Sequence, residues 1–191
     1  MDAGAGYGRI LPGIASRAKN VVSVEMDENM FGLLEKHARA YYNVTPVQGD
    51  YTKLDNILDG LKGQANVERP VIVSLQNSLG TTIGNMWKAV AEFRKTAEQR
   101  KGDIVLLVWN AENLNKCGFE LYNQLENMVG QRDDANTHLE SGLYVTKTGF
   151  LSQWSTPEMR ERLKRELSGQ LLGEIKTEPF TLMHFTYAGG K

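Results

Sequence analysis

The chain has 191 residues, with 22 Lys and Arg residues against 23 Asp and Glu residues and a net charge of −1. Binding to nucleic acid depends on clustered positive charge, so this balance argues against a nucleic-acid partner. The single cysteine, Cys117, excludes an internal disulfide, and because no apolar run reaches the ~20 residues of a membrane span and no signal-peptide pattern is visible, we expect a cytoplasmic protein without membrane contact.

The first feature along the chain is an acidic residue followed by three glycines at alternate positions. Residues 2–9 read D-A-G-A-G-Y-G-R, and apolar residues at helical spacing follow over residues 10–18. Glycines allow the tight turn and the close backbone approach that a nucleotide-like ligand needs beside a helix N-terminus. The spacing differs from the dinucleotide fingerprint G-x-G-x-x-G, because Arg9 stands where that fingerprint has its third glycine. A plain structural turn is the alternative interpretation.

Two short strands with acidic residues at their ends come next. Residues 21–24 predict a strand that ends at Glu25, and residues 44–48 predict a strand that ends shortly before Asp50. Between them, Asp27 is expected to cap a helix. An acidic residue about twenty positions after the glycine run, at the end of the second strand, is placed to accept hydrogen bonds from ribose hydroxyls. Alternatively, Glu25 is a charge at a helix N-terminus and Asp50 is a turn residue.

The following segments complete an alternation of strands and helices. Residues 71–75 predict a buried strand, the loop Q-N-S-L-G-T-T follows, and a helix is expected from about residue 83 to residue 100. Residues 103–109 form a nearly continuous apolar run, as in strands that have helices on both faces. This alternation predicts parallel βαβ units and an α/β fold with a doubly wound sheet.

The glycine run and the residues at the strand ends resemble the motifs of the class I S-adenosylmethionine-dependent methyltransferases, whose first motif is D/E-x-G-x-G-x-G. The resemblance implies a Rossmann-like, mostly parallel seven-stranded sheet with an antiparallel C-terminal strand, and S-adenosyl-L-methionine as the cofactor. It also implies that the loop after the fourth strand lies beside the reactive sulfonium. That loop resembles those of enzymes acting on small molecules, and it lacks the N/D-P-P-Y/F/W signature of enzymes that methylate amino groups of nucleic acids. The implied cofactor-binding residues are Asp2, Gly4, Ala5, Gly6, Tyr7, Glu25, Met26, Asp50, Tyr51, Gln76 and Asn77.

The pattern changes beyond Trp109. Residues 114–128 indicate a helix and residues 143–150 a strand. Thr156, followed by Pro157 and Glu158, predicts the start of a further helix. Two last segments, residues 173–176 and 180–187, predict an antiparallel hairpin at the edge of the sheet.

We expect a single domain, residues 1–191, in which residues 112–154 are an insertion that determines substrate specificity. Ligands of open α/β sheets bind outside the carboxyl ends of the strands, where loops vary while the scaffold stays fixed. The expected substrate-binding residues are Ser78, Trp109, Asn110 and Trp154. The alternatives are that Trp154 is an ordinary buried aromatic residue, and that Asn77 and Ser78 satisfy backbone groups of a turn.

The first strand of the sheet has the least support in the sequence. Only Met1 precedes Asp2, although the central strand of such a sheet pairs with a neighbour on each side. We therefore expect the first strand to be missing or truncated and the native N-terminus to be absent from this sequence. We also expect the chain to fold poorly or to bind the cofactor weakly.

The sequence as a whole predicts an S-adenosylmethionine-dependent methyltransferase that transfers a methyl group to a small-molecule acceptor. The alternatives are an NAD-linked oxidoreductase, which the glycine spacing disfavours, and a non-catalytic domain that binds adenosylmethionine or a partner protein. No catalytic base is identified, since His138 fits a surface loop at least as well as a general base. The three histidines are scattered, so no metal site is expected.

Overall fold

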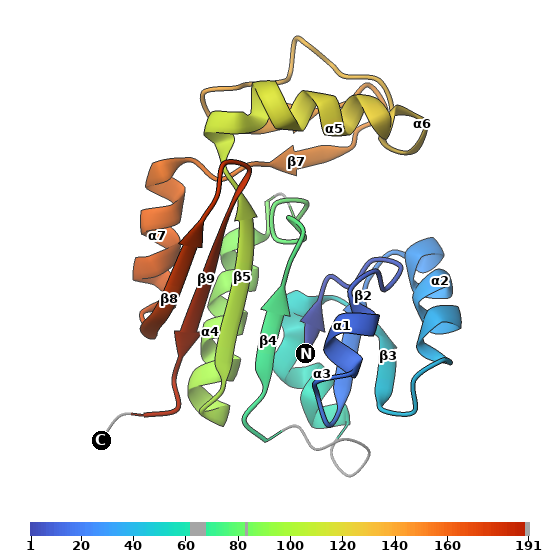
Figure 1. The fold of residues 1–191 in the computed structure, drawn as a ribbon, viewed down its shortest axis with the longest axis vertical. Coiled ribbons are helices and arrows are strands. Elements are labelled where there is room, and N and C mark those ends of the chain that lie inside the picture. The colour runs from blue at the N-terminus through green and yellow to red at the C-terminus, as the bar shows by residue number, and fades with distance from the viewer. Residues whose placement is uncertain (62–67, 83, 190–191) are drawn as a thin grey trace.

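The computed structural model describes residues 1–61, 68–82 and 84–189 (Figure 1). Its seven-stranded sheet has the order β3-β2-β1-β4-β5-β9-β8, with β1 to β5 parallel and β9 and β8 antiparallel, which confirms the predicted fold class. The strands of this sheet are β1 (Asp2–Ala3), β2 (Val21–Glu25), β3 (Val44–Gln48), β4 (Val71–Ser74), β5 (Asp103–Trp109), β8 (Gln170–Lys176) and β9 (Phe180–Thr186).

Helices pack on both faces of the sheet, as the apolar strands require. On one face α1 and α2 enclose a cluster around Leu11 and Leu34, and on the other face α3, α4 and α7 enclose the larger core around Phe93 and Leu163. The helices are α1 (Leu11–Ala15), α2 (Glu28–Ala38), α3 (Leu54–Gly60), α4 (Met86–Arg100) and α7 (Pro157–Leu167).

Two of the predicted helix caps are present. Asp27 accepts a hydrogen bond from the Met30 N–H over 2.9 Å at the start of α2. Thr156 accepts one from the Met159 N–H over 3.2 Å at the start of α7. These bonds satisfy N–H groups that have no partner within the helix. The first residue of the helix expected from residue 83, Ile83, lies outside the described residues, and α4 itself begins at Met86.

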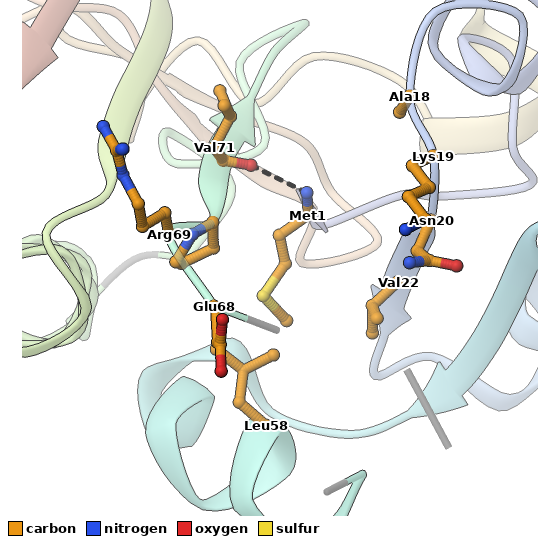
Figure 2. A pocket seen from close by; sticks show the side chains of 10 residues that line it. Met1, Ala18, Lys19, Asn20, Val22, Leu58, Glu68, Arg69 and Val71 are labelled. Carbon is orange, nitrogen blue, oxygen red and sulfur yellow. Dashed lines mark hydrogen bonds between the residues drawn. The ribbon is translucent and has the colours of Figure 1, made fainter. Parts of the chain in front are cut away.

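The central strand β1 is present but only two residues long, so of the two expectations, missing or truncated, the first strand is short rather than missing. Asp2 pairs in parallel with Ser23 of β2 and with Val73 of β4. Met1 extends this ladder, since its ammonium group donates to the Val71 carbonyl over 2.7 Å and its own carbonyl accepts from the Val73 N–H over 2.7 Å. Below Met1, between β2 and the residues that lead into β4, lies a cavity of about 330 Å³ (Figure 2). The glycine loop is therefore carried by a strand with few hydrogen bonds.

Residues 112–154 form a separate layer beyond the carboxyl ends of β4 and β5 (Figure 1). Three aromatic side chains, Tyr122, Tyr144 and Trp154, make a small core of its own. The helix expected over residues 114–128 is broken into three pieces, and the strand expected over residues 143–150 is instead part of a hairpin. The elements here are the 3-10 turn η2 (Ala111–Asn113), the π-helical turn η3 (Leu114–Gly118), α5 (Phe119–Gln124), α6 (Glu126–Val129), β6 (Leu143–Val145) and β7 (Leu151–Gln153).

Candidate functional site

The strand order reverses between β1 and β4, and a crevice opens at the carboxyl ends of the strands there. Open α/β sheets bind ligands at this kind of switch point. The crevice has a volume of about 440 Å³, within the usual range for small-ligand sites of roughly 300–1,000 Å³. It is lined by Gly4, Ala5, Gly6, Tyr7, Arg9, Glu25, Met26, Asp50, Tyr51, Gln76, Ser78, Thr81, Thr82, Leu125 and Met128. All the predicted cofactor-binding residues except Asp2 and Asn77 are among them.

The glycine loop presents bare backbone to the crevice. Gly4 and Gly6 have φ values of +79° and +55°, in the left-handed region that favours glycine. A Cβ atom on Gly4 would lie 2.7 Å from the Cβ atom of Ser78, so no larger residue fits there without displacement. The N–H groups of Gly4 and Ala5 both donate to the Val24 carbonyl, over 3.0 and 2.9 Å, which fixes the loop to the end of β2.

Glu25, the last residue of β2, organises the crevice wall. One carboxylate oxygen accepts the Gly6 N–H over 2.7 Å, and the other accepts the N–H groups of Met26 and Asp27 over 2.9 Å each. Because it spans two segments, this carboxylate connects the glycine loop to the turn that leads into α2. It remains partly exposed in the crevice, with acceptor capacity for a ligand hydroxyl.

Asp50 and Tyr51 stand after β3 and at the start of the 3-10 turn η1 (Tyr51–Lys53). Burial by itself would raise the pKa of Asp50, but hydrogen bonds from the Thr52 N–H and hydroxyl, each 2.8 Å, outweigh it and hold that pKa below its ordinary value. The Tyr51 ring packs against Phe93 with 5.7 Å between centroids, and its hydroxyl donates to the Ser78 carbonyl over 3.0 Å. A charged acceptor and a fixed aromatic ring therefore lie side by side at this end of the crevice.

Asp2 lies directly behind the glycine loop and is only 2% exposed. One of its carboxylate oxygens, Oδ2, has no hydrogen-bond partner among the described residues. Burial raises the pKa of Asp2 to about 6, opposed by the nearby Met1 ammonium and reinforced by the charge of Glu25. It borders a small hollow together with Gly4, Ala5 and Gln76. Buried polar atoms usually have partners, so this unpaired oxygen suits a cationic group of a ligand.

The loop after β4 forms the opposite wall and contains two non-glycine residues in the left-handed region. Gln76 and Asn77 have φ values of +55° and +63°. The Gln76 side-chain oxygen accepts two hydrogen bonds from the Arg9 guanidinium, over 2.9 and 2.5 Å. The Ser78 hydroxyl lies 2.8 Å from the Gly4 carbonyl, which joins this loop to the glycine loop. Asn77 points the other way: it is buried and its amide donates to the Ser152 hydroxyl oxygen over 2.9 Å.

Comparison with solved structures decides what this fold is. The CcbJ methyltransferase from Streptomyces caelestis matches with a TM-score of 0.65 at 16% identity, over 98% of this chain and 82% of that one. An S-adenosylmethionine-dependent methyltransferase from Clostridium acetobutylicum matches with a TM-score of 0.65 at 12% identity, over 98% of this chain and 83% of that one. The chain has a class I methyltransferase fold.

A third structure with the same methyltransferase fold was determined with small molecules bound. It is the 1,6-didemethyltoxoflavin-N1-methyltransferase of Burkholderia thailandensis, with bound 1,6-didemethyltoxoflavin and S-adenosylhomocysteine. Its TM-score is 0.60 at 13% identity, over 97% of this chain and 68% of that one. No protein-family model matches the chain, and no curated protein matches it in sequence. At such identities the likeness establishes the methyltransferase fold alone.

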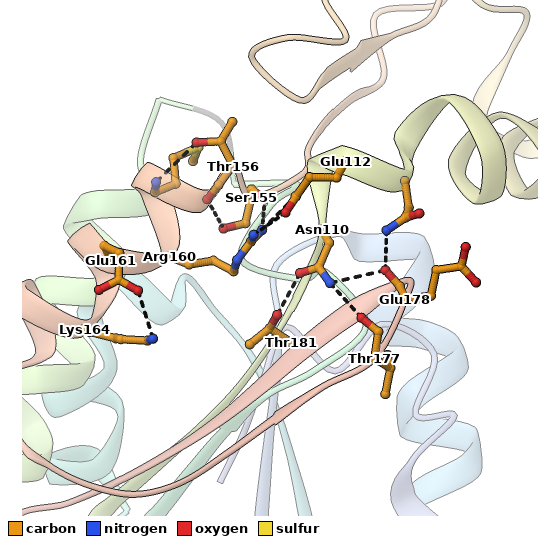
Figure 3. A network of polar contacts seen from close by, with 12 residues as sticks. Asn110, Glu112, Ser155, Thr156, Arg160, Glu161, Lys164, Thr177, Glu178 and Thr181 are labelled. Atoms are coloured by element: carbon orange, nitrogen blue, oxygen red, sulfur yellow. Dashed lines mark hydrogen bonds and ion pairs between the residues drawn. The ribbon is translucent and has the colours of Figure 1, made fainter.

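Of the expected substrate-binding residues, Asn110 and Trp154 are buried in this methyltransferase fold and Trp109 is half-buried. Trp154 is fully buried, and its ring meets that of Trp109 edge-on with 4.7 Å between centroids. Asn110 is also buried: its amide donates to the Thr177 carbonyl over 3.0 Å and its oxygen accepts from the Thr181 hydroxyl over 2.8 Å (Figure 3). None of the three lines the crevice, so we leave them out of the proposed acceptor site. Only Ser78 of this group borders the crevice.

Several residues that line the crevice were not expected from the sequence. Leu125 and Met128 reach it from the insertion, and the Met128 side chain is 67% exposed. In the sequence both fit the buried stripe of a helix, and nothing there shows that the helix breaks and turns them outward. Thr81 and Thr82 come from the loop after β4, and Arg9 follows the glycine run. His138 is exposed and does not line the crevice.

The described residues contain neither a metal-binding cluster nor a membrane-spanning helix. No group of three or more His, Cys, Asp or Glu side chains within residues 1–61, 68–82 and 84–189 is arranged to hold a metal ion. In the same part of the chain, no helix has the length and apolar character needed to cross a bilayer.

Proposed function

We propose that this protein is an S-adenosylmethionine-dependent methyltransferase that acts on a small-molecule acceptor. The observation that carries the proposal is the position of three carboxylates, Asp2, Glu25 and Asp50, around a bare glycine loop at the switch point of the sheet. The ligand they suit has a cationic amino group at one end and a ribose and base at the other. S-adenosylmethionine has these groups in this order.

Each part of the ligand has a matching set of residues. Glu25 would accept hydrogen bonds from the ribose hydroxyls. Asp50 and the turn at Tyr51 would bind the adenine. The unpaired oxygen of Asp2 would bind the methionyl amino group. Bound S-adenosylmethionine would supply a methyl group already activated by its sulfonium. What the chain must then do is hold the acceptor in line with that methyl group and keep water out.

The described crevice side chains favour an acceptor that gives up its proton easily. Glu25 is tied to three backbone N–H groups, and Asp50 is tied to Thr52. Burial, with the charges of Glu25 and Asp50, raises the pKa of Tyr51 well above its ordinary value, so its hydroxyl stays protonated. None of these groups is a free general base. An amine carries an attacking lone pair once its ammonium form has released a proton to bulk water, so it suits the crevice better than an alcohol or a carbon acid.

Two features support a small acceptor. Leu125 and Met128 extend over the crevice from the insertion and give it an apolar wall. Arg9 is the only cationic side chain among the described residues that line it, so a nucleic-acid backbone would find little positive charge there. The methyltransferase from Burkholderia thailandensis, which shares the fold, holds 1,6-didemethyltoxoflavin.

The proposal is tested first by ligand-induced stabilisation. A ligand that binds only the folded chain raises its free energy of unfolding by about 2.7 kcal/mol at a concentration of a hundred times Kd. S-adenosylmethionine and S-adenosylhomocysteine are expected to raise Tm, and NAD is not. If NAD alone raised Tm, the proposal would be wrong and an NAD-linked oxidoreductase would be the better interpretation.

The second test is methyl transfer from a labelled donor to a fractionated metabolite extract, with mass analysis of the product. A labelled small molecule is expected. Stabilisation by the donor without transfer to any fraction would favour a non-catalytic adenosylmethionine-binding domain.

A further inference from the structure

The insertion is joined to the crevice by a buried chain of hydrogen bonds. The Asn77 amide donates to Ser152 Oγ over 2.9 Å, and the Tyr122 hydroxyl donates to the same oxygen over 2.6 Å. The Trp154 indole N–H donates in turn to the Tyr122 hydroxyl over 3.0 Å. All four side chains are buried. We call these four residues, Asn77, Tyr122, Ser152 and Trp154, the latch.

The latch holds Asn77 within an uncommon backbone conformation. Gln76 and Asn77 are consecutive left-handed residues, and although Asn tolerates this region, it is usually adopted by single residues and is unfavourable for Gln. The backbone supports the same join, because the Gln153 N–H of β7 donates to the Gly80 carbonyl over 2.9 Å. At Gly80 a Cβ atom would lie 2.2 Å from the Gln153 carbonyl oxygen, so the loop and the insertion are in close contact.

The latch also connects two sets of crevice residues. On one side Asn77 stands between Gln76 and Ser78, which both line the crevice. On the other side Tyr122 lies in α5, one helical turn before Leu125 at the apolar wall. A buried polar network of this kind rigidifies what it joins when every member is satisfied.

We propose that Ser152 and Tyr122 are positioning residues that hold Asn77, and through it Gln76 and Ser78, in the conformation that binds the cofactor. This inference rests on the proposed function. By this inference the insertion has a second role beside acceptor binding, which is to hold the loop after β4. The same set of buried hydrogen bonds therefore joins the helix that carries Leu125 to the loop that carries Gln76 and Ser78.

The test compares three single variants by their affinity for S-adenosylhomocysteine, measured by calorimetry. Tyr122→Phe removes one hydroxyl from the latch but keeps the ring, which stacks on Tyr144 with 4.1 Å between centroids. Ser152→Ala removes the shared acceptor. Tyr144→Phe is the matched control, because it removes a hydroxyl from the other ring of the same buried stack, outside the latch. Tyr122→Phe and Ser152→Ala are expected to weaken binding about tenfold, the worth of one hydrogen bond, and the control less than twofold.

Two further measurements separate positioning from general destabilisation. In the ligand-free protein, hydrogen exchange at the amides of residues 76–81 is expected to speed up in Tyr122→Phe and Ser152→Ala and to stay unchanged in Tyr144→Phe. The double variant Tyr122→Phe/Ser152→Ala is expected to bind no more weakly than the weaker single variant, because both substitutions open the same network.

The outcomes distinguish the two levels of the argument. If the unmodified protein binds S-adenosylhomocysteine and both latch variants bind it equally well while their Tm falls, the positioning role is refuted and the proposed function stands. If the unmodified protein does not bind it, the proposed function fails and the positioning role fails with it.

Discussion

Gly6 and Glu25 are joined by a 2.7 Å hydrogen bond from the glycine backbone to the carboxylate. This bond means that Glu25, which we propose binds the ribose, also shapes the glycine loop. A single carboxylate at the end of β2 therefore has two tasks, and replacing it should disturb both.

Replacing Glu25 with Ala is expected to weaken binding of S-adenosylhomocysteine by about tenfold to a hundredfold, the worth of a charge-assisted hydrogen bond. Calorimetric titration measures the change. Glu28→Ala is the matched control, because Glu28 is an exposed acid three residues on, in the first turn of α2. Equal affinities in Glu25→Ala and the control would remove Glu25 from the proposed site.

Asp2 should give the free energy of unfolding an unusual pH dependence. Its pKa in the folded protein is about 6 against an ordinary value of 3.8, so between these values the folded chain holds its proton more tightly than the unfolded chain. The contribution of Asp2 to stability is therefore fully present below about pH 4 and is lost as the pH rises through 6. The loss amounts to about 3 kcal/mol.

Carboxylates such as Asp50 and Asp103, whose pKa values are lowered, give the opposite slope at lower pH, so the comparison must be made against Asp2→Asn. Urea unfolding of both proteins from pH 4 to pH 7 measures the difference. The unmodified protein should lose stability relative to Asp2→Asn across that range. Parallel curves would show that Asp2 has an ordinary pKa.

Gly4→Ala tests whether the glycine loop needs its bare backbone. The substitution places a Cβ atom 2.7 Å from that of Ser78 at a φ of +79°. The strain and the overpacking are expected to cost about 2–4 kcal/mol and to reduce cofactor affinity. Gly13→Ala, in α1 with open space around its Cβ, is the control and should be neutral or stabilising by up to ~1 kcal/mol. A Gly4→Ala protein as stable as the control would contradict the close approach.

Arg160 fastens the start of the insertion to α7. Its buried guanidinium donates to both carboxylate oxygens of Glu112, over 3.1 and 2.5 Å, and to the Ser155 carbonyl over 2.5 Å (Figure 3). Arg160→Ala is expected to lower the free energy of unfolding by about 2–3 kcal/mol. The loss is smaller than for a fully buried ion pair, because the half-exposed Glu112 carboxylate can be hydrated once Arg160 is removed. Arg39→Ala, which breaks an exposed pair with Glu35, should change it by less than about 0.5 kcal/mol. Chemical denaturation of the two variants gives both numbers.

The sheet was predictable because its local signals agree with its tertiary structure. The β-branched run of β2, the caps at Asp27 and Thr156 and the apolar run of β5 each favour the element that forms. The same holds for the crevice residues at the strand ends, since parallel strands bring their carboxyl ends to one edge.

The insertion was less predictable because its structure depends on contacts between distant residues. A Cβ atom on Gly118 would lie 2.8 Å from the Trp154 ring, and at this close contact the helix expected over residues 114–128 is wound as the π-helical turn η3, while the interruption between α5 and α6 falls at Leu125. In the expected strand over residues 143–150, Gly149 at a φ of +89° and the bond from the Thr146 N–H to the Phe150 carbonyl close a turn. Likewise, nothing local to Asn77 indicates that its partner is Ser152.

The strand order has a consequence for how the chain is made. Asp103 of β5 pairs with Thr186 of β9, which lies 83 residues further along the chain. While a ribosome is still adding those residues, one edge of the apolar strand β5 has no neighbour within its own chain. Contacts of such long sequence separation form late, and unpaired edges associate with other chains. The growing polypeptide is thus most exposed to aggregation after β5 has emerged and before β9 has, which is the interval in which a chaperone would matter most.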